Sequence, residues 1–279
     1  MIPVLLLLQA AQGQLAARPD AERPRHDAVH YDVWIRLADS GSVFQAAVTT
    51  TWRLIGREPL RINLDSAYRI RSLTIDGRTA TYHRQGADLL LVTLPATRKP
   101  TATTKIEYDG APPKFIREGR RQSGTQDDGL VQRGSGATRK IFADNWPNRA
   151  RKWLASQDHP SDKATVTWTI EAPSGLTVAA NGALLGKEPL ADGNTRWRFT
   201  IEQPIPVHTM VLGAARMSVA QLAPARCSVR CVPVSVYTYP EDSAWAVNGP
   251  FRRASEMVDF YSTLVAPFPY PEQIGRAHV

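Results

Sequence analysis

Alternation of apolar and polar residues is the feature that most constrains this fold, and it begins soon after His26. In HYDVWIRL (His30–Leu37) every second residue is apolar or aromatic, which is the period of a β-strand with one buried face. The same period returns along the chain in Phe44–Leu54, Leu60–Leu64, Ile70–Asp76, Leu89–Leu94, Thr104–Gly110, Lys163–Pro173, Thr195–Gln203, His208–Arg216 and Val232–Pro240. Turn pairs such as Asp76-Gly77 separate these segments. The sequence therefore predicts a mainly β protein.

Two segments depart from this pattern. Residues Ala111–Arg139 are rich in Gly, Arg, Ser and Asp and poor in apolar residues, which predicts a long exposed loop. Between Phe251 and Leu264 the apolar residues recur at three- and four-residue steps, which predicts an amphipathic helix that the prolines from Pro267 onward end. One helix after many strands indicates a new domain that begins near Trp245.

The two ends of the chain are also distinctive. The first residues, MIPVLLLLQAAQGQLAA, are similar to a secretory signal, although the usual basic residues are missing. The apolar run is shorter than the roughly 20 residues that span a bilayer, so no transmembrane span is expected. We interpret 1–25 as a signal-like segment and disordered lead of a secreted or periplasmic protein; a disordered apolar tail is the alternative. Residues 274–279 resemble a translated sequencing adapter and are a possible sequencing scar.

Composition favours a folded protein that does not bind nucleic acid. Apolar residues make up 43% of the chain, which is enough for a large core. The net charge of +8 is scattered along the chain, without a basic motif interleaved with aromatic residues. The cysteines, Cys227 and Cys231, are too far apart on a flat strand to form a disulfide, but a turn between them would permit one.

Sequence motifs for catalysis are missing from this chain. There is no His-Glu-x-x-His pair for zinc, no Gly-x-Ser-x-Gly nucleophile elbow and no phosphate-binding glycine loop. The histidines are dispersed, and none of them is predicted to ligate a metal. We therefore assign no catalytic residue and no metal ligand to the chain.

The segment Phe142–Ile170 concentrates charged and aromatic residues without a clear period, which is typical of a loop that recognises a ligand. A structural role is the alternative for each residue. Asp158 and Asp162 could brace turns around Pro160, and Arg151 could pair with one of them.

This segment resembles the aminopeptidase N family of zinc metallopeptidases, the gluzincins. The resemblance rests on ARKWL (Ala150–Leu154) and DHPSDKA (Asp158–Ala164), and then on LTVAANG (Leu176–Gly182), VYTYPED (Val236–Asp242) and FPYPE (Phe268–Glu272) in the family's order. It implies a large, twisted, mostly antiparallel β N-terminal domain over 26–243, followed by the first helix of a catalytic domain over 244–273. In the family the zinc-binding helix follows the Tyr-Pro turn, so this chain is expected to end before the metal site.

The resemblance also implies a function and one site. The full-length protein would use one Zn²⁺ to remove N-terminal residues from peptides, whereas this chain, without its catalytic domain, would bind no zinc and be inactive. A family residue shortly before the Ala-Arg pair holds the α-amino group of the substrate. Its position falls at Asp144, with Asn145 as the second candidate. Both side chains carry an oxygen that can accept hydrogen bonds from an ammonium group.

Two other functions remain open from the sequence. The chain could be a non-catalytic protein-binding scaffold of the same family. It could instead be an unrelated secreted β-sandwich module that binds carbohydrate on tryptophans, of which the candidates are Trp34, Trp52, Trp146, Trp153 and Trp197. Several of these lie on the inward phase of their strands, so core packing is expected for them.

Overall fold

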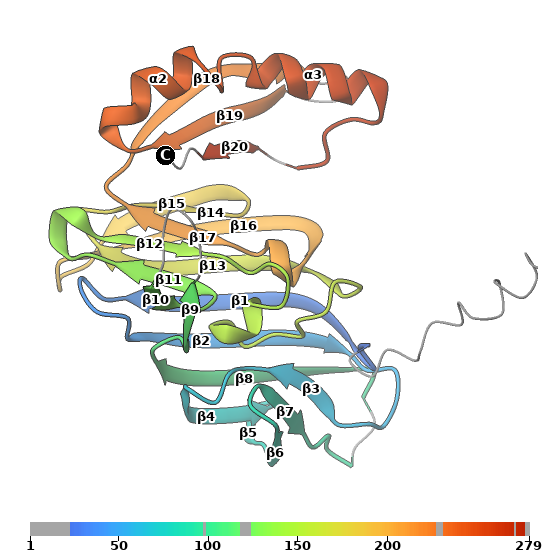
Figure 1. Cartoon of the computed structure of the whole chain (residues 1–279). Helices are drawn as coiled ribbons and strands as arrows, with labels where there is room; N and C mark the ends of the chain where they lie inside the picture. Colours follow the sequence, from blue (N-terminus) through green and yellow to red (C-terminus); the bar gives the residue numbers. More distant parts are fainter. Residues whose placement is uncertain (1–22, 97–98, 118–123, 227–230, 271, 277–279) are drawn as a thin grey trace, which may run out of the picture.

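The computed structural model describes residues 23–276 except 97–98, 118–123, 227–230 and 271, and for 273–276 it describes the backbone alone. Its main element is an eight-stranded sheet with the order β15-β16-β13-β1-β2-β8-β4-β5 (Figure 1). These strands are β15 (Ala183–Pro189), β16 (Asn194–Pro206), β13 (Lys163–Pro173), β1 (Asp27–Leu37), β2 (Phe44–Arg53), β8 (Thr101–Gly110), β4 (Arg69–Ile75) and β5 (Arg78–Thr79). All neighbours are antiparallel except β1 and β13, which run parallel.

Alternation along the strands places one face of this sheet in the core. On β1 the side chains of Tyr31, Val33 and Ile35 are fully buried, while Asp32 and Trp34 between them point to the other face. Two smaller sheets cover the buried face (Figure 1). One is β3 (Leu60–Asn63), β7 (Leu89–Val92) and β6 (Tyr82–Gln85); the other is β11 (Leu130–Arg133), β12 (Lys140–Ala143), β17 (Leu212–Ala215) and β14 (Thr177–Ala180). The predicted mainly β fold is confirmed.

Local sequence explains the turn between β4 and β5. Ile75 pairs with Arg78, which leaves a two-residue loop of Asp76 and Gly77. Both residues have positive φ, 49° and 76°, as a type I′ hairpin turn requires. The predicted hairpin signal is therefore confirmed at this position.

The tryptophans divide between core and surface. Trp52, Trp153 and Trp168 are fully buried, and the rings of Trp153 and Trp168 stack with centroids 6.2 Å apart. Trp197 is also buried, so the expectation of core packing is confirmed for most of the candidate platforms. Trp146 is 66% exposed and Trp34 is partly exposed, so these two remain available to a ligand.

The expectation of a long exposed loop over Ala111–Arg139 is wrong for the described part of that segment. It contains β9 (Lys114–Arg117), β10 (Gly124–Asp127), β11 and the 3₁₀ turn η1 (Gly136–Thr138). Its interior is partly polar, because the buried side chains of Asp127, Gln132 and Arg139 replace apolar ones. Arg139 Nη2 donates to Gln132 Oε1 over 2.8 Å, and Gln132 Nε2 donates to the carbonyl of Ser42 over 2.7 Å. Because these buried side chains are polar, the segment lacks the alternation of apolar and polar residues that would have predicted its strands.

A second lobe follows residue 217. It consists of the sheet β18 (Ser218–Arg226), β19 (Cys231–Thr238) and β20 (Gln273–Arg276), the turn η4 (Pro240–Asp242), and the helices α2 (Ser243–Asn248) and α3 (Ala254–Leu264), with a small core of its own (Figure 1). The predicted helix is present but begins at Ala254 instead of Phe251. Cys231 is exposed, whereas Cys227, and with it the question of a disulfide, lies outside the described residues. The backbone of residues 273–276 pairs in parallel with β19.

Candidate functional site

Asp144 and Asn145 follow directly after β12, where the chain leaves the sheet and turns into the 3₁₀ turn η2 (Ala150–Lys152). The backbone N–H of Asp144 donates to the carbonyl of Gly129 over 2.6 Å, which extends the pairing between β11 and β12 by one residue. The N–H of Arg149 donates to the carbonyl of Asn145 over 2.9 Å and closes the turn. Both predicted anchor residues are thus held on a short, well-bonded loop.

Asn145 has a structural role. Its side chain is buried, and its Nδ2 donates to the carbonyl of Met210 over 2.7 Å. Its Oδ1 accepts a hydrogen bond of 2.7 Å from the indole Nε1 of Trp153. Because both ends of the amide are engaged inside the protein, Asn145 is not available to a substrate amine. Of the two predicted anchors, only Asp144 has an exposed side chain.

Asp144 lies at the surface in a small charged cluster. Its side chain is 44% exposed, and its Oδ2 accepts a hydrogen bond of 2.7 Å from Arg149 Nη1. Arg149 Nε lies 3.0 Å from Asp128 Oδ1, close enough for an ion pair but without the alignment of a hydrogen bond. The same guanidinium covers the ring of Phe115 at 4.3 Å. Arg149 is therefore fixed between two carboxylates and an aromatic ring.

The electrostatics of this cluster favour a cation. Two carboxylates face one guanidinium, so the cluster is negative when both are ionised. Burial raises the pKa of the Asp128 carboxyl, and the charge of Arg149 partly offsets this rise. Lys152 also lowers the pKa of Asp128, whereas Asp144 is exposed, so an ammonium group could approach its carboxylate from solvent.

Trp146 adds an exposed aromatic side chain two residues after Asp144. It precedes a cis proline, Pro147, and its ring meets that of His208 edge to face with centroids 5.3 Å apart. From the sequence, Trp146 was a candidate only as a stacking platform for carbohydrate. Its contact with His208 was not predictable, because the two residues are more than sixty positions apart. The loop thus carries an exposed carboxylate and an exposed aromatic ring two residues apart in the sequence.

Most of the other charged residues in this segment hold the fold together. Arg151 donates from Nε to Asp158 Oδ2 over 3.0 Å and from Nη2 to the Asp158 carbonyl over 2.9 Å, and both side chains are buried. This confirms the expected pairing of Arg151 with one of the two aspartates. Asp162 is buried as well, next to the start of β1. The structural interpretation therefore holds for these residues.

Metal binding finds no support in this part of the protein. Among the residues that the structure describes, no three His, Cys, Asp or Glu side chains gather closely enough to hold an ion. The donor set therefore does not fit a zinc ion. Over the same residues no helix has the length and apolar character needed to cross a bilayer.

A large, mostly antiparallel sheet covered on one face, followed by a lobe that begins with β18 and β19 and continues into α2 and α3, has the architecture of the N-terminal β-domain found in metallopeptidases. The sequence matches the Peptidase M1 N-terminal domain over residues 28–208. The chain therefore belongs to the M1 peptidase family, and the resemblance stated from its motifs is confirmed.

Solved structures agree on the fold. An M1 zinc metallopeptidase from Deinococcus radiodurans superposes with a TM-score of 0.73 at 21% identity, over 91% of this chain and 56% of that one. A mutant of that enzyme bound to a Tyr-Ser-Ala substrate gives 0.73 at 21% identity, over 90% and 56%. Yeast LTA4 hydrolase gives 0.74 at 18% identity, over 100% and 42%. The chain thus spans about half the length of these proteins. No curated protein matches it.

Proposed function

We propose that this chain is the N-terminal part of an exported zinc aminopeptidase that removes N-terminal residues from peptides. Membership of the M1 family and the fold shared with zinc metallopeptidases support the peptidase class. The apolar N-terminal residues, which resemble a secretory signal, support export. The zinc site would belong to a catalytic domain outside these residues, since the described donors do not fit a metal. This chain alone would then have no peptidase activity.

Asp144 carries the proposal at residue level. Its carboxylate is exposed, fixed by Arg149 and part of a cluster with excess negative charge. A peptide's α-ammonium group would donate a charge-assisted hydrogen bond to this carboxylate, while Trp146 would cover the apolar part of the first residue. The β-domain would therefore form one wall of the substrate cleft.

One experiment tests the peptidase class directly. The source DNA downstream of the Gln273 codon is sequenced, and the protein encoded by the whole reading frame is expressed and assayed with an alanine-anilide substrate. We expect a His-Glu-x-x-His motif and activity that a zinc chelator removes. A reading frame without the zinc motif would favour the alternative, a non-catalytic protein-binding scaffold of the same family.

The role of Asp144 needs a separate measurement in that protein. Asp144→Asn should lower kcat/KM for the unblocked substrate by about tenfold or more, because a charged hydrogen bond contributes about 1.5–3 kcal/mol. Glu241→Gln, an exposed acid-to-amide change in the second lobe, is the matched control and should leave kcat/KM unchanged. Equal kcat/KM for Asp144→Asn and the unmodified protein would remove Asp144 from the substrate site.

A further inference from the structure

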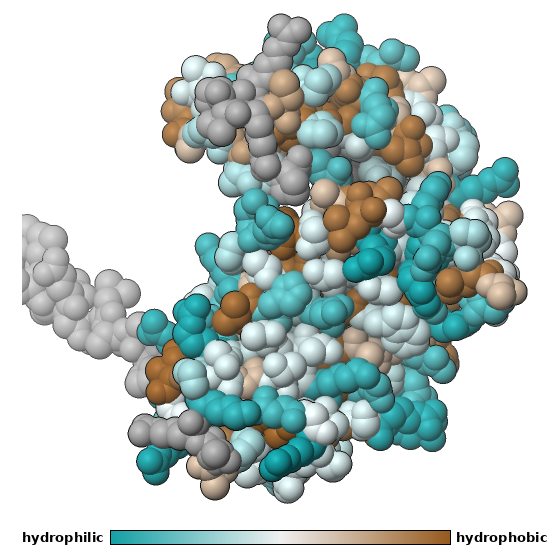
Figure 2. All heavy atoms as spheres, turned by 180° about the vertical axis from the view of Figure 1, so that it is seen from behind, coloured by the Kyte–Doolittle hydropathy of each residue, from teal (hydrophilic) through white to brown (hydrophobic). Residues whose placement is uncertain are grey.

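The outward face of the eight-stranded sheet carries a feature that the peptidase proposal does not use. Seen from behind, this part of the surface consists mostly of residues with intermediate or hydrophilic hydropathy, drawn in white and teal (Figure 2). Trp34 stands on this face, and the register places Ala47 of β2 on one side of it and Thr169 of β13 on the other. Both neighbours are small, so the indole is left partly exposed.

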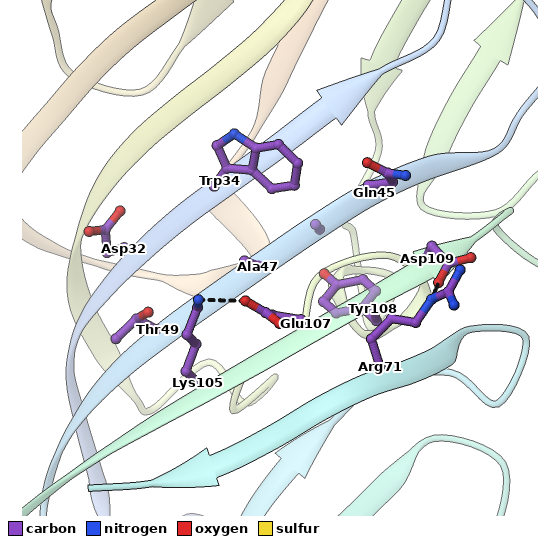
Figure 3. Close-up of a pocket in the computed structure, with 11 residues that line it drawn as sticks. Asp32, Trp34, Gln45, Ala47, Thr49, Arg71, Lys105, Glu107, Tyr108 and Asp109 are labelled. Atoms are coloured by element: carbon purple, nitrogen blue, oxygen red, sulfur yellow. Dashed lines mark hydrogen bonds and ion pairs between the residues drawn. The ribbon is translucent and has the colours of Figure 1, made fainter. Parts of the chain in front are cut away.

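A hollow of about 540 Å³ opens beside this indole. Its lining comes from adjacent strands, with Trp34 and Asp32 from β1, Gln45 and Thr49 from β2, and Glu107 from β8 (Figure 3). The volume lies in the range of ligand-binding pockets. The sheet therefore offers a shallow depression with one aromatic wall.

Polar side chains in the hollow keep free hydrogen-bonding capacity. Asp32 and Gln45 are exposed, and neither makes a side-chain hydrogen bond to another residue of the described chain (Figure 3). A carboxylate accepts hydrogen bonds only, whereas the Gln45 amide both donates and accepts. This combination suits a ligand with several hydroxyl groups.

Charges in the hollow are largely neutralised in pairs. Lys105 Nζ lies 2.5 Å from Glu107 Oε1, and Arg71 pairs with Asp109. The hydrogen bond from Lys105 lowers the pKa of the Glu107 carboxyl, with a further contribution from Ser72. Both cations therefore have partners, which disfavours a polyanion such as a nucleic acid.

A protein partner fits this face less well. The backbones of β1 and β2 are each paired on both sides, so an extended peptide cannot add to them as a new strand. Among the residues that line the hollow, Trp34 is the one large apolar side chain on this face, because Tyr108 is buried on the other face of the sheet. Protein interfaces, in contrast, bury clusters of large apolar side chains.

We propose that this face binds a neutral oligosaccharide. The C–H groups of a sugar ring would stack on the indole of Trp34, whose π-face carries partial negative charge. The hydroxyl groups would bond to Asp32, Gln45 and Thr49, directly or through water. None of these residues belongs to the Asp144 cluster, so the saccharide proposal can be tested independently of the peptidase proposal.

The test titrates the full 279-residue chain with neutral hexasaccharides of glucose, xylose and N-acetylglucosamine by calorimetry. At least one saccharide should bind with a Kd of about 1 mM or tighter. Trp34→Ala should weaken that binding about tenfold or more, and Gln45→Ala, at an exposed position, should weaken it less. Trp245→Ala, which removes an indole that is 58% exposed on α2, is the matched control and should bind like the unmodified chain.

Circular dichroism confirms that each variant is folded. Absence of binding by every saccharide at about 10 mM would overturn the proposal. Equal affinity of Trp34→Ala and the unmodified chain would also overturn it, as would binding of unstructured peptides through Trp34 when no saccharide binds.

Discussion

Replacing Asp162 by Asn should stabilise the protein at neutral pH. The Asp162 carboxyl is buried, and its Oδ2 has no hydrogen-bond partner in the described structure. Burial raises its pKa from 3.8 to about 6, with the nearby charge of Asp27 adding to the rise and hydrogen bonds from Gln157 and the Ala28 backbone opposing it. The folded protein therefore holds a proton here that the unfolded chain releases.

The size and sign of the effect follow from this difference in pKa. Below about pH 4 the carboxyl is protonated in both states, so it costs the folded state nothing. As the pH rises from about 4 to about 6, the unfolded chain loses the proton first, and the free energy of unfolding falls. A shift of about two units corresponds to about 3 kcal/mol, which is the full penalty above pH 6.

Asp162→Asn removes the ionisable group and keeps an oxygen that can accept the same hydrogen bonds. Urea unfolding followed by tryptophan fluorescence, between about pH 4 and pH 8, measures the outcome. The variant should match the unmodified protein near pH 4 and exceed it by about 2–3 kcal/mol above pH 7. Glu241→Gln removes one exposed negative charge and should show no such trend. A difference that stays constant with pH, or grows towards acid pH, would refute the reasoning.

Three further substitutions test other contacts. Asn145→Ala removes the acceptor of Trp153 Nε1 and should lower the free energy of unfolding by about 2–3 kcal/mol in urea; a loss under about 0.5 kcal/mol would contradict its structural role. Arg151→Leu leaves the Asp158 carboxylate buried without this cation and should cost about 3–5 kcal/mol, part of which Asp158→Asn in the same chain should restore. Leu264 is 67% exposed on the apolar face of α3, so Leu264→Ser should reduce self-association in analytical ultracentrifugation, and unchanged association would show that this face is not adhesive.

Sequence reasoning succeeded where one face of a strand is buried by apolar side chains. In β1 the residues Tyr31, Val33 and Ile35 follow the period of two, and all three reach the core. It failed where the interior is polar. Asp127, Gln132 and Arg139 are buried through hydrogen bonds, and short strands between glycines gave no apolar signal. Hydropathy alone reads such a polar interior as an exposed loop.

The candidate site shows the same limit. The family resemblance predicted the anchor at Asp144, with Asn145 as the second candidate, but gave no indication of which side chain is exposed. The contact that buries Asn145 is distant in sequence, because its side chain donates to the carbonyl of Met210, whereas Asp144 pairs with Arg149, five residues away. Tertiary contacts, not the local sequence pattern, decide which of the two side chains is exposed.

The motif residues that identify the family do not by themselves show that a member is an active peptidase. In DHPSDKA, the buried Asp158 carboxylate is hydrogen-bonded to Arg151, and these contacts contribute to the fold, not to substrate binding. A chain that lost peptidase activity would still need these contacts to fold. The motif therefore identifies the β-domain equally well in an active enzyme and in a scaffold. Under our proposal, activity would depend instead on exposed groups such as Asp144 and on the zinc motif, so the active enzyme and the scaffold would differ at these positions.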